Sequence, residues 1–126
     1  MPDQPSRSSV ADGAYVWSPD RMIARLGGDE QLTRQLVTLF LSECPRMMAQ
    51  VRDSVEQGSA DVMRRAAHAF KGSVSNFSTD GPTVTAFELE SLGREGTIAG
   101  APALLARLER EVALLLDQLR AFDATP

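Results

Sequence analysis

The chain has 126 residues, a net charge of −4 and a pI of about 4.9. Its length fits one domain, and its 43% hydrophobic content is enough for one core. The acidic balance argues against nucleic-acid binding through a broad basic face. No apolar run reaches the roughly 18 residues of a membrane-spanning helix, and the first residues have no apolar secretory core. We therefore expect a cytoplasmic protein.

Metal and redox chemistry have few candidate residues. Cys44 is the only cysteine and His68 the only histidine. An intrachain disulfide and a thiolate metal cluster are therefore excluded, and no acidic loop suits a hard cation. We expect no metal site and a buried Cys44. The sequence also has no glycine-rich phosphate loop, so we expect neither ATP binding nor autokinase activity.

The N-terminal residues 1–17 are rich in proline, serine, aspartate and glycine, and they predict a disordered arm or linker. Trp17 is expected to be the first residue that packs. Ser18 and Pro19 have the chemistry of a helix start, which predicts a short helix over residues 20–26 that ends at two glycines.

The first long helix is predicted from a cap at Asp29 to about residue 57, where Gly58 would end it. Pro45 falls inside this segment and predicts either one kinked helix or two helices that meet near Glu43. We prefer the kink because the apolar spacing continues across the proline. The apolar positions are Leu32, Leu36, Leu39, Phe40, Met47, Val51 and Val55.

Three further helices are predicted over residues 60–77, 82–94 and 102–122. Ser59 would cap the first of them, and Ser78 or Asp80 the second. Residues 123–126 are expected to fray. The third long helix has Val84, Phe87, Leu89 and Leu92 as its apolar set, and the fourth has Leu104, Leu108, Val112, Leu115, Leu119 and Phe122. These patterns predict an all-α fold, an antiparallel four-helix bundle over residues 18–122 with a short extra helix in front.

Residues 66–73 (AAHAFKGS) stand out within the second long helix. Its apolar stripe, formed by Met63, Ala67, Phe70, Val74 and Phe77, defines the buried side. His68 lies roughly 140° around the helix from the centre of that stripe and should face solvent. Gly72 lies beside it, although a mid-helix glycine costs about 1 kcal/mol relative to alanine. Close approach of another macromolecule would explain the glycine.

The segment HAFKGS resembles the His-x-x-Lys-Gly-Ser signature of the histidine-containing phosphotransfer (Hpt) domain of bacterial phosphorelays. Residues 25–30 (RLGGDE) are similar to the family's loop before the first long helix. Leu39-Phe40-Leu41 with Pro45 is similar to that helix, and Leu89-Glu90 with residues 93–96 (GREG) to the third. The resemblance covers about residues 18–122. Phe77-Ser78 departs from the family, which often has Leu-Gly or Phe-Gly there.

The resemblance implies a phosphocarrier without enzymatic activity of its own. His68 would accept a phosphoryl group through Nε2 from the aspartate of a receiver domain and pass it to another receiver. An imidazole is largely neutral near pH 7, so it needs no general base. Lys71 would screen the phosphoryl charge, and Gly72 would admit the partner. Ser73 is assigned to helix packing.

Three further residues are predicted to contact the phosphoryl group or the partner: Ser75, Arg64 and Arg65. The implied partners are receiver domains of a hybrid sensor kinase and of a response regulator, with Mg²⁺ supplied by the receiver. We expect a monomer that binds neither nucleic acid nor membrane. A docking module of the same fold that transfers no phosphate is the main competing interpretation.

A histidine kinase and a hydrolase fit the sequence less well. A histidine-kinase dimerisation helix usually has an acidic residue after its histidine, where this chain has Ala69. A hydrolase would need a complete catalytic set, which a single histidine without a paired carboxylate or nucleophile does not supply.

Overall fold

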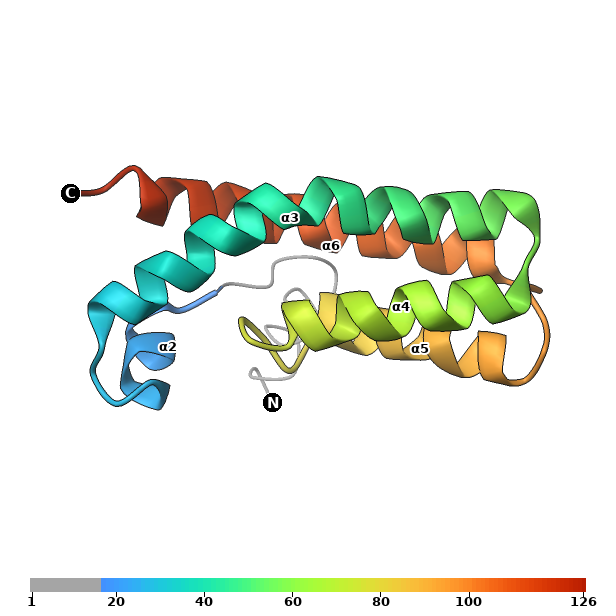
Figure 1. Ribbon diagram of the computed structural model, residues 1–126, viewed down its shortest axis with the longest axis horizontal. Helices are drawn as coiled ribbons and strands as arrows, with labels where there is room; N and C mark the ends of the chain where they lie inside the picture. The colour runs from blue at the N-terminus through green and yellow to red at the C-terminus, as the bar shows by residue number, and fades with distance from the viewer. Residues whose placement is uncertain (1–16) are drawn as a thin grey trace, which may run out of the picture.

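The computed structural model describes residues 17–126, and all regular structure in this part of the chain is helical. The predicted arm, residues 1–17, lies outside the described residues except for Trp17. Four long helices run antiparallel along one axis, and a short helix lies at one end (Figure 1). The all-α bundle prediction is confirmed. The helices are α2 (Pro19–Arg25), α3 (Glu30–Gln57), α4 (Ala60–Val74), α5 (Pro82–Arg94) and α6 (Ala101–Asp123).

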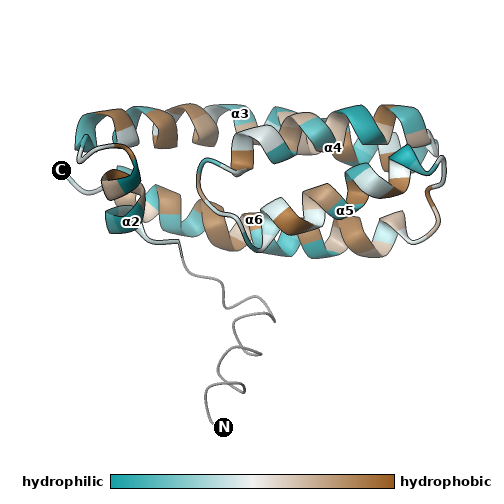
Figure 2. Ribbon diagram, turned by 90° about the horizontal axis from the view of Figure 1, so that it is seen from below, coloured by the Kyte–Doolittle hydropathy of each residue, from teal (hydrophilic) through white to brown (hydrophobic). Residues whose placement is uncertain are grey.

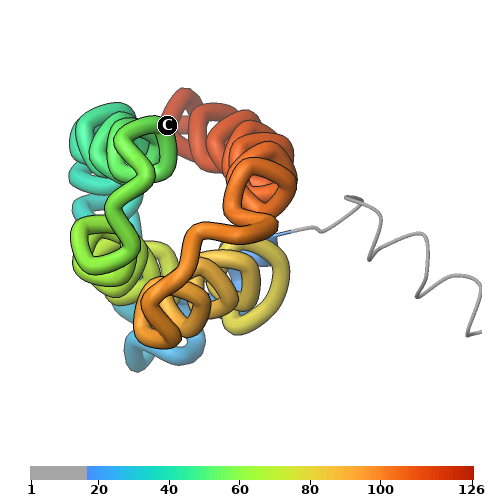
Figure 3. Tube along the Cα trace, turned by 90° about the vertical axis from the view of Figure 1, so that its right-hand side faces the viewer, coloured from blue at the N-terminus to red at the C-terminus, as the bar shows by residue number. Residues whose placement is uncertain are grey.

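The long helices surround one core in the order α3, α4, α5, α6, and each packs against two neighbours (Figure 3). Hydrophobic and hydrophilic segments alternate along each of them, as amphipathic helices require (Figure 2). The inward positions are filled by apolar side chains from all four helices. The most deeply buried large ones are Phe70, Met63, Leu89, Leu108, Leu115 and Leu119, and Met22 of the short helix α2 is buried with them.

The first three helices start at the predicted caps. The side chains of Ser18, Asp29 and Ser59 each accept a hydrogen bond from a backbone N–H in the first turn of α2, α3 and α4, respectively. These bonds satisfy donors that have no partner inside the helix. Gly58 ends α3 in the left-handed conformation at φ 71°, which a side chain with a Cβ would disfavour.

Helix α3 passes through Pro45 without a break, so the single-helix prediction is confirmed. Its axis bends near the middle, and its N-terminal half extends past the end of α4 (Figure 1). Two residues of the predicted apolar stripe are exposed, Leu32 and, at 57%, Leu39, and a third, Leu36, is only partly buried. They belong to the overhanging half, where α4 no longer covers the outer part of the stripe.

Helix α4 ends at Val74, three residues before the predicted end at residue 77. Two polar side chains supply the reason. The Ser75 hydroxyl donates to the carbonyl of Gly72, and the Asn76 amide donates to the carbonyl of Ser73. These bonds satisfy carbonyls that a continuing helix would have paired. Phe77 is nevertheless buried, as the stripe predicted.

Helix α5 has the predicted bounds but not the predicted cap, and its inner face matches the prediction only in part. Gly81 is its N-cap, and no side chain caps it, because the Ser78 hydroxyl bonds within the loop to Asp80. Val84 and Phe87 were expected inside, yet both are exposed. Leu89 is buried as predicted, and the buried side also carries Pro82, Thr85, Ala86, Glu90 and Gly93.

Helix α6 starts one residue before the predicted position, and its stripe packs as expected. Its C-terminal end is held by Arg34 of α3, which donates to the carbonyls of Phe122 and Thr125 and stacks over the Phe122 ring. Trp17 packs edge-on against the rings of Phe77 and Phe122, which closes this end of the core. Within residues 17–126, no helix has the length and apolar content needed to span a bilayer.

Candidate functional site

The site is centred on His68 in the middle of α4. Its side chain is 66% exposed, as the helical spacing predicted. On the other side of the same helix, Met63, Ala67 and Phe70 are fully buried. The packing of these residues fixes the rotation of α4, and that rotation directs His68 toward solvent along the seam with α5.

A buried carboxylate from α5 organises the basic groups of this seam. Glu90 is only 2% exposed. Its Oε2 lies 2.9 Å from Nδ1 of His68 and 2.8 Å from a guanidinium nitrogen of Arg94, and its Oε1 lies 2.7 Å from Nζ of Lys71. One carboxylate therefore holds three basic side chains, which offset the cost of burying its charge.

The ionisation of Glu90 follows from these contacts. Burial alone would raise the pKa of the Glu90 carboxyl group, but hydrogen bonds and charge from Lys71 and His68 outweigh burial and lower that pKa to about 2. Glu90 is thus ionised at neutral pH and can only accept hydrogen bonds. The proton between Glu90 and His68 must then belong to Nδ1. A neutral His68 consequently carries its free lone pair on the exposed Nε2.

Lys71 is more confined than a surface lysine. Its side chain is 26% exposed, with Nζ on Glu90 and 5.2 Å from the centre of the Phe87 ring. The structure therefore places the predicted phosphate contact beside His68, but paired with a carboxylate. A phosphoryl group on His68 would compete with Glu90 for this ammonium group.

Gly72 lies next to His68 on the open side of α4. A Cβ built on it meets nothing within 4 Å. No packing inside the described part of the chain therefore explains a glycine here. Ser75 lies one turn farther along, is exposed, and donates to the carbonyl of Gly72. This bond gives Ser75 a role at the helix end as well as a position on the predicted contact surface.

The two arginines predicted to contact the phosphoryl group or the partner form ion pairs away from His68. Arg64 and Arg65 both pair with Asp61 in the first turn of α4, at 2.9 and 3.1 Å. The hydrogen bond from Arg64, followed by the charge of Arg65, lowers the pKa of the Asp61 carboxyl group. This carboxylate partly neutralises the positive charge of the two arginines.

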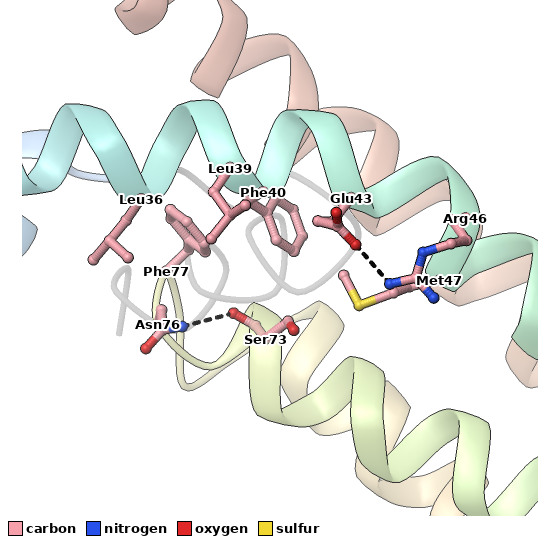
Figure 4. Close-up of a pocket in the computed structure, with 9 residues that line it drawn as sticks. All are labelled: Leu36, Leu39, Phe40, Glu43, Arg46, Met47, Ser73, Asn76 and Phe77. Atoms are coloured by element: carbon pink, nitrogen blue, oxygen red, sulfur yellow. Dashed lines mark hydrogen bonds and ion pairs between the residues drawn. The ribbon is translucent and has the colours of Figure 1, made fainter.

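Ser73 lies at a groove between α3 and α4 rather than at His68. Figure 4 shows its side chain at the α4 edge of the groove, opposite the aromatic and aliphatic side chains of α3. The groove encloses about 160 Å³, well below the roughly 300 Å³ of a typical small-molecule pocket. Its lining residues are Leu36, Leu39, Phe40, Glu43, Arg46, Met47, Ser73, Asn76 and Phe77. The packing role of Ser73 stays a prediction.

Glu90 and Arg94 belong to the site, although sequence patterns alone did not identify them. Both residues were noted only for the resemblance of their segments, Leu89-Glu90 and residues 93–96, to the family's third helix. A signal was present, because the two residues form an i, i+4 acid–base pair on a helix that otherwise has an apolar inner face. Within residues 17–126, no three His, Cys, Asp or Glu side chains are grouped in a way that could hold a metal ion.

Comparison with known proteins places this geometry in a family. The model of the Hpt domain family matches residues 35–122. The fold is similar to that of histidine-containing phosphotransfer protein B (HptB) from Pseudomonas aeruginosa PAO1, with a TM-score of 0.75 and 28% identity over 82% of this chain and 91% of that one. The search of curated proteins found no match.

A second solved structure supports the fold alone. The HPT domain of an Hpt sensor hybrid histidine kinase from Shewanella aligns with a TM-score of 0.70 and 14% identity, over 86% of this chain and 96% of that one. The same bundle is therefore found at low sequence identity.

Proposed function

Because the chain belongs to the Hpt domain family, the phosphotransfer modules of two-component systems, we propose that His68 is its phosphoacceptor. His68 would take a phosphoryl group from the aspartyl phosphate of one receiver domain and pass it to the aspartate of another. The resemblance to the family signature and the exposure of the imidazole support this assignment.

The observation that carries the proposal is the contact between Nδ1 of His68 and Oε2 of Glu90 at 2.9 Å. It keeps the Nδ1 proton in place and leaves Nε2 as the exposed nucleophile. As Nε2 bonds to phosphorus, the bond from phosphorus to the aspartyl oxygen breaks. The ring becomes a cation, and its Nδ1–H still faces the ionised Glu90.

This pairing favours both directions of transfer. The carboxylate stabilises positive charge on the ring as it develops, because the two groups are already in contact and need no reorganisation. It also keeps Nδ1 protonated after transfer, so the phosphorylated ring stays cationic and can leave easily in the reverse step. Reversible exchange between two aspartates requires both properties.

The surrounding groups supply charge and access. Lys71 and Arg94 bring positive charge to within contact distance of the same carboxylate as His68, and together they would screen a phosphoryl group during its in-line passage. Gly72 would leave room for the rim of the receiver's acidic pocket. The Mg²⁺ used in transfer would belong to that pocket, and the receivers would come from a hybrid sensor kinase and a response regulator.

The test is acquisition of phosphate from a panel of receiver domains phosphorylated with acetyl phosphate in the presence of Mg²⁺. We expect an acid-labile, alkali-stable phosphate on the wild-type chain and none on His68→Gln. Because His68 is exposed, the free energy of unfolding should change by less than about 1 kcal/mol in this variant. Circular dichroism and a thermal melt provide that control.

Two outcomes would contradict the proposal. Acid-labile phosphate that persists on His68→Gln would place the acceptor elsewhere. Receivers that bind the wild-type chain but leave it unphosphorylated would favour the non-transferring docking module. A folded variant without phosphate, next to a phosphorylated wild type, is the result that only the phosphoacceptor assignment explains.

A further inference from the structure

Phe87 is an exposed aromatic residue beside the proposed phosphoacceptor, and packing of the core does not explain it. It lies three residues before Glu90 on α5 and is 49% exposed. The sequence pattern had placed this ring in the core. In the structure the Phe87 ring faces the ammonium group of Lys71, which lies 5.2 Å from the ring centre.

Lys71 is the only lysine of the chain, which has twelve arginines. The distinction has a chemical meaning. A guanidinium group forms a rigid fork that locks onto a carboxylate, whereas an ammonium group is a compact charge that can exchange one oxygen partner for another. A cation that leaves Glu90 for a phosphoryl group is therefore better supplied by lysine.

The freedom of a lysine side chain to change partners also makes it entropically costly to hold in place. An exposed lysine loses side-chain entropy when it is held in one place, so ion pairs at surfaces contribute little. Lys71 is held from two sides, by the Glu90 carboxylate at 2.7 Å and by the face of the Phe87 ring. The ring still attracts the cation when the carboxylate contact is released, because the attraction comes from its negative face.

We infer that Phe87 is a positioning residue for phosphoryl transfer, which retains the Lys71 ammonium group beside His68 while that group exchanges Glu90 for the phosphoryl oxygens. The expected effect of Phe87 on the rate of transfer rests on the proposed function. The confinement of Lys71 by the ring is independent of phosphate and can be tested without it.

The structural test uses the single lysine. Protein labelled with ¹³C-lysine gives one lysine side chain in the NMR spectrum, so no assignment is needed. We expect the protons next to Nζ to be shifted upfield by the ring in the wild type. The shift should disappear in Phe87→Leu, which keeps apolar volume but has no ring, and should persist in Phe87→Tyr. An unshifted wild-type signal would overturn the inference whether or not the chain carries phosphate.

The kinetic test compares four proteins with the receiver that transfers fastest: wild type, Phe87→Leu, Lys71→Met and the double variant. At saturating receiver, Phe87→Leu should slow transfer roughly two- to fivefold, the value of an exposed cation–π contact. In the Lys71→Met background the same substitution should have no further effect. Phe87→Tyr should restore the wild-type rate.

A matched control is Val84→Ala, which trims another exposed apolar side chain one turn earlier on α5. It should leave the rate at saturating receiver unchanged. If Phe87→Leu slows transfer equally with and without Lys71, or only raises the receiver concentration for half-maximal rate, then Phe87 is a docking contact and the inference is wrong. If wild-type protein accepts no phosphate, the proposed function fails, while the NMR result still decides the confinement of Lys71.

Discussion

Two glycines lie on the seam between α4 and α5, and they meet opposite surroundings. At Gly72 on α4, an added Cβ would have nothing within 4 Å. At Gly93 on α5, the same atom would lie 2.6 Å from the carbonyl oxygen of Ala60 and 2.9 Å from the backbone nitrogen of Arg64. One glycine is required by the fold. The other has no structural requirement in residues 17–126, which points to a partner outside the molecule.

The comparison also explains how the site is assembled. Gly93 is three residues after Glu90, on the same buried side of α5. Because it has no side chain, α5 approaches the first turn of α4 closely enough for backbone contact. This close approach brings the Glu90 carboxylate to His68 and Lys71. The close packing at Gly93 thus sets the geometry at His68.

The largest expected effect is that of Gly93→Ala. The Cβ would meet backbone atoms of α4, which cannot rotate away, so the two helices must separate. We expect a loss of at least about 3 kcal/mol in the free energy of unfolding, the upper part of the range for overpacking. Urea denaturation followed by circular dichroism measures it.

Gly72→Ala is the matched control for this substitution, since it adds the same methyl group to the same pair of helices. If Gly93→Ala lowers the free energy of unfolding no more than Gly72→Ala does, then the contact with the Ala60 carbonyl does not limit how closely the two helices pack. In a Gly93→Ala protein that still folds, the loosened seam should also weaken the contact between Glu90 and His68.

The contrast between these glycines marks what sequence can predict. Capping residues such as Asp29 and Ser59 act on N–H groups three residues away, so local pattern located the helix starts. The exposure of His68 followed from helical period alone. These features depend on neighbours in the chain, which the sequence displays directly.

The inner face of α5 depended on distant residues and was predicted only in part: Leu89 and Leu92 pack against the core, but Val84 and Phe87 do not. Glu90 is buried because basic side chains of α4, about twenty residues earlier in the chain, approach it. Gly93 is buried because the backbone of α4 approaches it. Neither partner can be identified by periodicity. Phe87 looked like a core residue for the same reason, since only the position of Lys71 shows why a ring would remain at the surface.

The second prediction concerns the charge at the centre of the seam. The pKa of Glu90 is lowered to about 2 in the folded protein from an ordinary value of 4.5. A carboxylate with a depressed pKa stabilises the fold above its unfolded pKa, and this stability is lost as pH falls from about 4.5 toward 2. The full contribution amounts to at most about 3 kcal/mol.

Glu90→Gln isolates this contribution, because the variant keeps the shape and loses the charge. The difference in unfolding free energy between wild type and variant should be largest above pH 5 and shrink between pH 4.5 and 2, as measured by urea denaturation across that range. A difference that stays constant with pH would mean that the ionised carboxylate does not supply this stability. At neutral pH the variant should also transfer phosphate more slowly, since a neutral amide stabilises a cationic ring less than a carboxylate does.

The smallest effect on stability, and the one most specific to function, is expected at the open glycine. Gly72→Ala should raise the free energy of unfolding by up to about 1 kcal/mol, because alanine is the better helix former and its Cβ meets nothing. Gly72→Leu should also leave the fold intact.

Transfer rates with a receiver should nevertheless fall in the order glycine, alanine, leucine at position 72, because each added atom occupies space the partner needs. Stability and transfer would then change in opposite directions at one position, which packing within the chain cannot produce. Unimpaired transfer by Gly72→Leu would remove the partner as the reason for this glycine.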